Sequence, residues 1–290
     1  MLEIRRARPE DREVVFSFCA HTWEDGDYIP QVWEAWLADE EGPLLVGVWD
    51  GQVVAVEKIT RSSADEVWLE GLRVDPRRRR QGIARALFHY ALEWAKSNGA
   101  RFVRLATSST NRTVQRMVEA AGLRHVLSCP YYQGQALAGG EEPERLSQEV
   151  AGEVWERLRR WGGLERAHYL YAHEWAWEPL TSERLQEHLA AGQVWGVRRE
   201  GLLAALAIFE ERGEQPTIGF LDGENEGVIR LARSLRFRAR RHPSGKIAAL
   251  PREEPALLSA LEEAGYQRVW DFSFWVYEGV LRCPDSPNSA

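Results

Sequence analysis

The sequence predicts an α/β (α+β) protein built from two domains, and three observations lead to this prediction. The chain has 290 residues, which is the length of about two domains of ordinary size. Segments with strand-like and helix-like apolar patterns alternate through its first half, and a weaker copy of this order follows in the second half. A hydrophobic content of 44% suffices for packed cores and excludes a disordered chain.

The first elements follow from short apolar runs separated by turn residues. Asp50-Gly51 is a strong hairpin signal, because both residue types tolerate the backbone angles of a tight turn. We therefore expect a strand over 2–7, a helix from Pro9 towards Cys19, a loop over 21–30, a helix around 32–37, and a hairpin of strands 44–49 and 53–60.

The most informative segment follows this hairpin. An apolar run from Val67 to Val74 reads as a strand, and Asp75-Pro76 ends it because proline lacks a backbone N–H. Four arginines (residues 77–80) and Gly82 then precede an amphipathic helix that begins at Ile83. The N-terminus of a helix after such a turn presents backbone N–H groups to an anion, and phosphate is the usual occupant.

The remaining elements of the first half complete the alternation. Asn98-Gly99 ends the helix, a strand follows near 102–105, and Ser109-Thr110 caps a helix that ends at Gly122. A last strand covers 125–132, and a glycine-rich stretch then reads as a linker. The predicted boundaries are a first domain over 1–137, a linker over 138–146, a second domain over 147–282 and a flexible tail over 283–290.

The second half of the sequence is a degenerate repeat of the first half. Residues 194–206 echo 45–56, and residues 255–266 echo 111–123. At the position of the arginine-rich turn, the second copy instead reads Asp222-Gly-Glu-Asn-Glu226, whose three carboxylates would repel a phosphate.

Charge and cysteine usage exclude several classes of function. The net charge of −7 disfavours nucleic acid and membranes as partners. Three widely spaced cysteines without a C-x-x-C pattern argue against disulfides and a zinc site, so we expect no metal. The chain begins without an apolar leader and has no apolar run of membrane-spanning length, which predicts a cytoplasmic protein.

The segment Arg79-Arg80-Gln81-Gly82-Ile83-Ala84, in this order of elements, resembles the GNAT superfamily of acyl-CoA-dependent N-acetyltransferases. The resemblance covers residues 1–135 and includes the opening stretch 4–11. It implies two GNAT-like domains, each a mixed, mostly antiparallel twisted sheet flanked by helices, in a tandem GNAT protein with a degenerate C-terminal copy. The implied cosubstrate is acetyl-CoA, and the implied cofactor-binding residues are Leu72, Arg73, Val74, Arg79, Arg80, Gln81, Gly82, Ile83, Ala84, Arg85 and Asn111.

These residues also have plainer interpretations. The alternative for the arginines is a solvated charged turn, and the alternative for Asn111 is an ordinary helix-capping residue. The resemblance assigns the pyrophosphate to the N–H groups of residues 80–85, and the pantetheine arm to Leu72, Val74 and Asn111.

Acyl transfer to an amine needs a base that accepts the ammonium proton. Glu70 is the first candidate, because regular alternation places it on the same strand face as Leu72 and Val74; a solvent-facing carboxylate is the alternative. His125 is a weaker catalytic candidate, as is Glu66. Many GNAT enzymes carry a tyrosine seven residues after the helix-opening asparagine, where it acts as the general acid that protonates the departing thiolate. This chain has Val118 at that position.

The acceptor side is predicted at residues 21–37, where acidic and aromatic residues mix. Trp23, Asp27 and Tyr28 suit a cationic amine, through carboxylate pairing and cation–π contact. Trp33 and Trp36 are equally explained as core residues of an amphipathic helix. Residues 27–30 with Trp36 resemble the histidine N-acetyltransferase branch of the family.

The predicted function is therefore acetyl-CoA-dependent N-acetylation of a small amine or amino acid, by direct transfer in a ternary complex. Two alternatives stay open: a non-catalytic acyl-CoA-binding sensor or scaffold, and an RNA-associated protein that uses Arg77–Arg80. The sequence leaves the acceptor, the acyl-chain preference and homodimer formation undecided.

Overall fold

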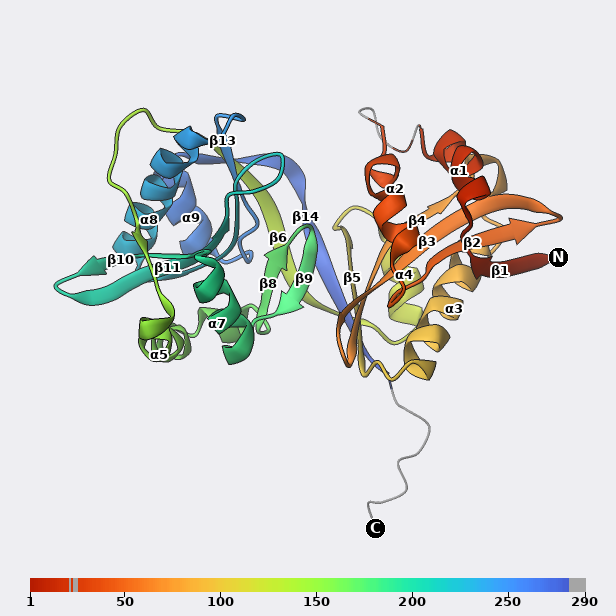
Figure 1. Cartoon of the computed structure of the whole chain (residues 1–290), viewed down its shortest axis with the longest axis horizontal. Coiled ribbons are helices and arrows are strands. Elements are labelled where there is room, and N and C mark those ends of the chain that lie inside the picture. Colours follow the sequence, from red (N-terminus) through yellow and green to blue (C-terminus); the bar gives the residue numbers. More distant parts are fainter. Residues whose placement is uncertain (21, 23–25, 282–290) are drawn as a thin grey trace, which may run out of the picture. The chain divides into compact units, whose positions relative to one another are not determined.

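The structure is a computed structural model that describes residues 1–20, 22 and 26–281. The chain divides into two compact units (Figure 1). Unit 1 comprises residues 1–106 and 113–124 together with the described residues from Tyr277 onward, and unit 2 comprises 107–112 and 125–276. Each unit contains strands covered by helices, which confirms the predicted α/β class.

Unit 1 contains the strands and helices predicted for the first half up to the helix that ends at Gly122, together with the end of β14 (Tyr266–Val280). Its strand order is β1-β2-β3-β4-β5-β14, antiparallel from β1 to β4 and parallel between β4 and β5. The elements are β1 (Leu2–Arg6), η1 (Pro9–Asp11), α1 (Arg12–Cys19), α2 (Ile29–Ala38), β2 (Leu44–Trp49), β3 (Gln52–Ser63), β4 (Glu66–Val74), η2 (Pro76–Arg78), α3 (Ile83–Ser97), β5 (Phe102–Ser108) and α4 (Arg112–Ala120).

The core of unit 1 follows from strand alternation. Val46 and Val56 pack with apolar residues of α1 and α2, including Trp33 and Trp36. The neighbouring positions point to the other side of the sheet, where Gly47 lies against Ile83 of α3. Helices therefore cover both faces of this sheet, with α1 and α2 on one side and α3 on the other (Figure 1).

A β-bulge interrupts β4 at Gly71. The registered pairs are Lys58 with Glu70 and Val56 with Arg73, so two residues of β4 lie opposite Glu57 alone. Gly71 has a φ of +68°, and a Cβ there would lie 2.8 Å from the ring of Trp36, so only glycine fits.

The bulge corrects one prediction about the candidate base. Glu70 pairs with Lys58 and faces the side of α1 and α2, whereas Val74 pairs with Ala55 and faces the side of α3. The expectation that Glu70 shares a face with Leu72 and Val74 is therefore wrong, because the extra residue reverses the alternation.

Strands β4 and β5 pair over only a short stretch. Their registered pairs run from Glu66↔Phe102 to Trp68↔Arg104, while β4 continues to Val74. Arg104 closes the paired end through ion pairs with Glu66 (3.1 Å) and Glu278 (2.7 Å), so Glu66 is a structural residue. In the described part of the chain, the registered pairing of β4 with β5 ends at Trp68, which leaves the edge of β4 beyond it open on this side.

Unit 2 repeats the arrangement of a sheet with helices. Its strand order is β14-β6-β13-β12-β11-β10-β7, and β8 and β9 form a separate hairpin. The elements are β6 (Arg124–Gln135), β7 (Glu144–Arg145), η3 (Gln148–Val150), α5 (Ala151–Trp161), α6 (Gly163–Arg166), β8 (Leu170–His173), β9 (Ala176–Pro179), α7 (Ser182–Ala191), β10 (Val194–Arg199), β11 (Leu202–Glu210), β12 (Thr217–Gly223), α8 (Asn225–Arg238), η4 (Ala239–Arg241), β13 (Lys246–Ala249), α9 (Pro255–Glu263) and β14 (Tyr266–Val280).

The division into units differs from the predicted boundaries at 137 and 147. Strand β6, expected at the end of the first domain, pairs antiparallel with β13 from Lys246↔Gln135 to Ala249↔Tyr132. The end of β14, expected in the second domain, belongs to unit 1. Local patterns could not show this exchange, because both strands pair with partners distant in sequence. The predicted tail over 283–290 lies outside the described residues.

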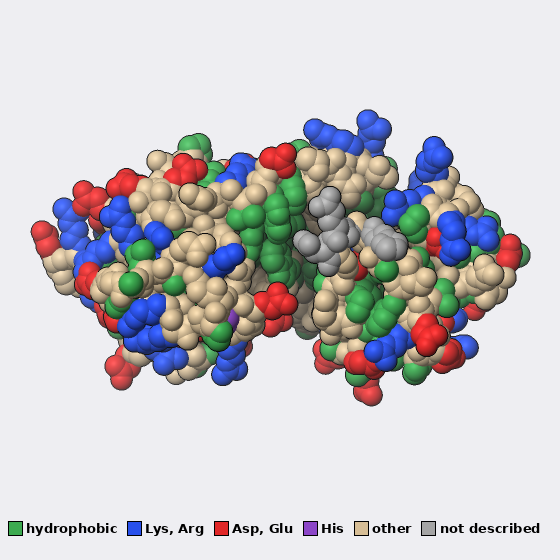
Figure 2. Space-filling view, turned by 90° about the horizontal axis from the view of Figure 1, so that it is seen from above, with side chains coloured by type: hydrophobic (Ala, Val, Ile, Leu, Met, Phe, Trp, Pro, Cys, Tyr) green, Lys and Arg blue, Asp and Glu red, His purple; other side chains and the backbone are tan. Residues whose placement is uncertain are grey.

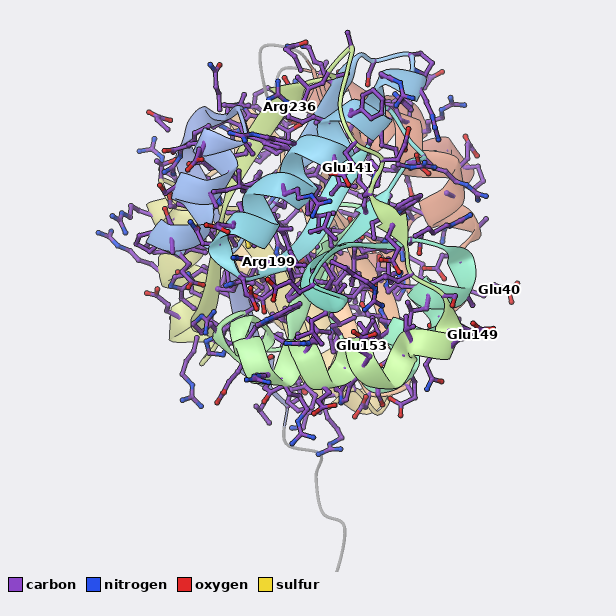
Figure 3. All side chains as sticks on the ribbon, turned by 90° about the vertical axis from the view of Figure 1, so that its left-hand side faces the viewer. Glu40, Glu141, Glu149, Glu153, Arg199 and Arg236 are labelled. Carbon is purple, nitrogen blue, oxygen red and sulfur yellow. The ribbon has the colours of Figure 1, made fainter. Side chains whose placement is uncertain are left out.

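The predicted linker is tied down within unit 2. Its end forms β7, which pairs with β10. Glu141 lies beside α8 (Figure 3) and binds Arg230 through both carboxylate oxygens, at 2.5 and 2.9 Å. On the face shown in Figure 2, basic and acidic side chains are interspersed over the surface, as expected for mixed surface charge.

Candidate functional site

The turn after β4 is shaped by Asp75. Its Oδ1 accepts the backbone N–H of Arg77 (2.9 Å), and its carboxylate binds the Arg77 guanidinium (2.7 Å). The hydrogen bond from the Arg77 side chain, aided by the Arg77 N–H, holds the pKa of Asp75 below its usual range. The predicted strand breaker therefore also organises the short helical turn η2.

Gly82 caps helix α3 from a left-handed conformation, with a φ of +78°. No atom lies within 4 Å of where its Cβ would be, so the space in front of the helix is open. The first helical hydrogen bond runs from Ala86 N–H to the Gly82 carbonyl, so the N–H groups of residues 83–85 precede it. This end of α3 carries the positive pole of the helix dipole.

Arginine residues flank this helix end in the sequence. Arg79, Arg80 and Arg85 are exposed. Within the described residues, Arg78, Arg79 and Arg80 form no ion pair, whereas Arg77 is bound to Asp75. A glycine without steric hindrance, a helix N-terminus and available guanidinium groups together fit a phosphate or pyrophosphate group. The predicted residues 79–85 thus lie around one helix end.

The predicted residue Arg73 points elsewhere. Its Nε donates to the Asp27 carboxylate (2.7 Å), and its Nη1 donates to the carbonyl oxygen of Leu72 (3.1 Å). The Asp27 side chain is fully buried and also accepts the N–H of Ile29 at the start of α2 (3.1 Å). The structure therefore joins a predicted cofactor residue to a predicted substrate residue, and this ion pair fixes the start of α2 against β4.

Glu70 lies beside this ion pair, on the same face of β4. Its Oε1 accepts the hydroxyl of Thr60 (2.7 Å). Tyr28 lies close by, with its ring perpendicular to Trp36 (centroids 5.8 Å apart) and the Arg73 guanidinium 5.6 Å from its centroid. Glu70, Tyr28 and Trp36 thus form an acidic and aromatic cluster, the combination predicted for a cationic amine.

Tyr28 has a perturbed hydroxyl. Burial of the hydroxyl and the nearby charge of Glu70 raise the pKa of Tyr28 above its ordinary value. The residue as a whole is 39% exposed. The third predicted substrate residue, Trp23, lies outside the described residues.

Three further predicted positions belong to other elements of the structure. His125 belongs to unit 2, where its ring stacks on Trp275 at 4.5 Å and its Nε2 lies 3.0 Å from the Leu127 carbonyl. Asn111 also belongs to unit 2 and immediately precedes α4. Val118 is fully buried on α4 and supplies no acid.

Two buried charged residues next to the site were missed. The Lys58 ammonium donates to Asp39 (2.6 Å) and to the carbonyls of Ile59 (2.6 Å) and Gly42 (3.0 Å), and burial lowers the pKa of Lys58. Glu57 lies opposite the bulge, and burial raises its pKa to about 8. The signal was Glu57-Lys58 itself, which interrupts an otherwise apolar strand.

The second copy lacks the turn. Glu224 alone joins β12 to α8, whereas residues 75–82 join β4 to α3. Gly227 lies inside α8, where a Cβ would approach the Ala204 carbonyl oxygen to 2.7 Å. Asp222 is buried and binds Arg252 (2.9 Å), whose Nη1 also donates to the Leu221 carbonyl (3.0 Å). The Arg252 side chain thus contacts the backbone of β12, whereas the edge of β4 beyond its pairing with β5 is open.

Comparison with known sequences identifies the first half. Residues 5–123 match the model of the Acetyltransferase (GNAT) family. A histidine N-acetyltransferase of Oreochromis niloticus is 30% identical over 97 residues, and that of Scomber australasicus is 29% identical over 97 residues. Each match covers 33% of this chain and only 29% of the relative's length.

Comparison with solved structures identifies the fold of both units. A GCN5-related N-acetyltransferase from Sphaerobacter thermophilus aligns with a TM-score of 0.68 and 15% identity, over 97% of this chain and 96% of that one. A tandem GNAT protein from the clavulanic acid biosynthesis pathway aligns with a TM-score of 0.57 and 15% identity, over 98% and 100%. At these identities the likeness shows the fold alone.

The described residues contain no helix with the length and apolarity needed to cross a bilayer. They also contain no group of three or more His, Cys, Asp or Glu side chains arranged to hold a metal ion. Residues 5–123 thus match the acetyltransferase (GNAT) family model, and the chain has the fold of a tandem GNAT protein.

Proposed function

We propose that the protein is an acetyl-CoA-dependent N-acetyltransferase that acts on a small amine or amino acid by direct transfer in a ternary complex. The observation that carries this proposal is the turn at Gly82, an open helix end flanked in the sequence by arginines without ion pairs in the described structure. Residues 80–85 would hold the pyrophosphate, and the open edge of β4 would hold the pantetheine arm.

Acetyl-CoA supplies an activated acyl group, and the chain's residues supply position and proton transfer. The acceptor nitrogen attacks the thioester carbonyl carbon while the C–S bond breaks, and the amine proton passes to Glu70 directly or through one water. Backbone N–H groups at the open edge of β4 would stabilise the developing oxyanion. Thr60 fixes the Glu70 carboxylate through its hydrogen bond.

The thiolate would leave without the usual tyrosine. Val118 is buried at that position and cannot donate a proton. A thiol with an ordinary pKa near roughly 8.5 is already a good leaving group, and a general acid adds only about 10²–10⁴-fold. Water therefore suffices to protonate the thiolate, at some cost in rate.

We further propose that only the first of the two GNAT-like domains binds acetyl-CoA, because the second lacks the turn and its Arg252 side chain donates to the Leu221 carbonyl of β12. A cytoplasmic location and homodimer formation remain predictions.

Acetyl-CoA binding tests the proposal directly. Isothermal titration calorimetry should detect binding in the micromolar range, and Gly82→Glu should abolish it by placing a carboxylate in the phosphate site. Gly99→Glu is the matched control: Gly99 also has a positive φ (+82°) and open space, but it follows the C-terminal end of the same helix. Equal loss in both variants, or no binding by the wild type, would contradict the proposal.

The alternative is a non-catalytic acyl-CoA sensor, favoured by Val118 and by the degenerate second copy. A panel of amines and amino acids that begins with histidine, the substrate named for the curated relatives, separates the two functions. Mass spectrometry should detect an N-acetylated product with acetyl-CoA present. A sensor would bind acetyl-CoA and yield no product with any member of the panel.

A further inference from the structure

We propose that Trp36, supported by Ile29, restricts the acyl donor to acetyl-CoA and excludes longer acyl groups. This inference builds on the proposed function and names the donor class that the site accepts. It concerns two buried residues of α2, of which Trp36 is also interpreted from the sequence as a core residue of an amphipathic helix.

The first observation is the contact between Trp36 and the bulge in β4. A Cβ at Gly71 would lie 2.8 Å from both Cη2 and Cζ3 of Trp36, and 3.9 Å from Cδ1 of Ile29. The ring therefore packs directly on the bulge backbone, on the face of β4 that carries Glu70. Trp36 is 9% exposed and Ile29 is fully buried.

The second observation is the path that an acyl-CoA must follow. With its pyrophosphate at Gly82, an extended arm can pair with β4 from Val74 back towards the bulge. Each strand residue advances roughly 3.3 Å, so an arm several residues long brings the acyl group to the Gly71–Leu72 bulge. On the face where Glu70 waits for the acceptor, the space beside the bulge is occupied by Trp36 and Ile29.

The Trp36 ring has little freedom to move aside. The Tyr28 ring packs edge-on against the Trp36 ring, with the two centroids 5.8 Å apart. The Arg73 guanidinium in turn lies over the Tyr28 ring, 5.6 Å from its centroid. The buried Asp27–Arg73 ion pair holds this end of α2 on β4. An acetyl methyl group is small enough for such a site, but each added methylene must displace a packed indole ring.

The experiment compares two tryptophans of one helix. Trp36→Leu opens the space beside Gly71, whereas Trp33→Leu removes a buried indole of α2 that packs on Phe16 at 5.6 Å. Calorimetry measures the dissociation constants of acetyl-, propionyl- and butyryl-CoA for each protein, and this readout needs no acceptor. Thermal unfolding of each variant shows that it is folded.

We expect the wild type to bind butyryl-CoA at least about tenfold more weakly than acetyl-CoA, the lower bound of what one misplaced methylene costs a shaped pocket. Trp36→Leu should bring this ratio to within about twofold, and Trp33→Leu should leave it at the wild-type value. If Trp36→Leu does not fold, Trp36→Phe should give an intermediate ratio, because a smaller ring still occupies part of the space.

Two results would overturn the inference while leaving the proposed function intact. The first is that the wild type binds all three acyl-CoAs with equal affinity. The second is that Trp36→Leu and Trp36→Phe keep the wild-type ratio of the butyryl-CoA and acetyl-CoA dissociation constants. Absence of any acyl-CoA binding by the wild type is a different outcome, which would refute the proposed function and the inference together.

Discussion

Glu57 shows at the scale of one residue how the bulge creates an unusual environment. Its side chain is 1% exposed, and within the described structure its Oε2 has no hydrogen-bond partner. Burial alone raises the pKa of Glu57 to about 8, against an ordinary value of 4.5. At neutral pH the folded protein therefore keeps this carboxyl protonated.

This residue should make stability depend on pH. Between pH 4.5 and about 8, the unfolded chain has released the Glu57 proton but the folded chain retains it, so the free energy of unfolding falls as pH rises. The slope from this group is roughly 1.4 kcal/mol per pH unit. Urea unfolding at pH 5 to 8 should show a flatter dependence for Glu57→Gln than for the wild type. Glu40→Gln, an exposed control (Figure 3), should follow the wild type.

Arg73 and Arg79 should separate structure from cofactor binding. Arg73→Met leaves the buried Asp27 carboxylate without its partner and should lower the free energy of unfolding by about 3–5 kcal/mol. Arg79 is exposed and makes no ion pair within the described chain, so Arg79→Met should change stability by less than about 0.5 kcal/mol while weakening acetyl-CoA binding. A stable Arg73→Met variant would show that the ion pair does not hold α2 on β4.

At the scale of elements, the two copies differ in one connection. Residues 75–82 form a turn that exposes a helix N-terminus, whereas Glu224 alone leads directly into α8. The length and glycine content of the connection thus decide whether the helix N-terminus is exposed, as an anion site requires.

The difference predicts a stoichiometry of one acetyl-CoA per chain. Calorimetry should give a single class of sites with the wild type and none with Gly82→Glu. A stoichiometry of two would mean that unit 2 also binds acetyl-CoA. It would do so although Arg252 contacts the Leu221 carbonyl of β12 and Ala204 packs closely on Gly227 in the first turn of α8.

The sequence predicted where β4 ends and where α3 begins, but not the bulge within β4. The strand break at Asp75-Pro76 and the helix start after Gly82 appeared where expected, because proline and glycine set backbone angles locally. The bulge at Gly71 was missed, since a single glycine inside a strand does not show that a tryptophan from another element needs its space.

At the scale of the whole molecule, the two units exchange strands. Tyr277 near the end of β14 is fully buried in unit 1 and donates its hydroxyl to Glu119 of α4 (2.9 Å). Gly279 packs against Leu123 and Val103 of the same unit. Unit 1 therefore contains a strand segment that follows all of unit 2 in the sequence.

This exchange predicts that residues 1–137 do not fold alone. Such a fragment lacks the end of β14, and its β6 loses the β13 partner, leaving apolar surface and strand edges exposed. Circular dichroism should show no cooperative thermal unfolding of the fragment. Coexpression with residues 138–290 should restore it together with acetyl-CoA binding. A fragment that unfolds cooperatively on its own would instead support the boundary predicted at residue 137.

The sequence by itself determined the α/β class, the resemblance of the first half to the GNAT family, and the turn between Asp75 and the helix that begins at Ile83, because these depend on local periodicity and on residues adjacent in the chain. Only the tertiary structure decided which face Glu70 occupies, that Arg73 binds Asp27, and which strands complete each unit. The physical reason is the same in each case: a bulge, a buried ion pair and a strand pairing are set by contacts between residues far apart in sequence.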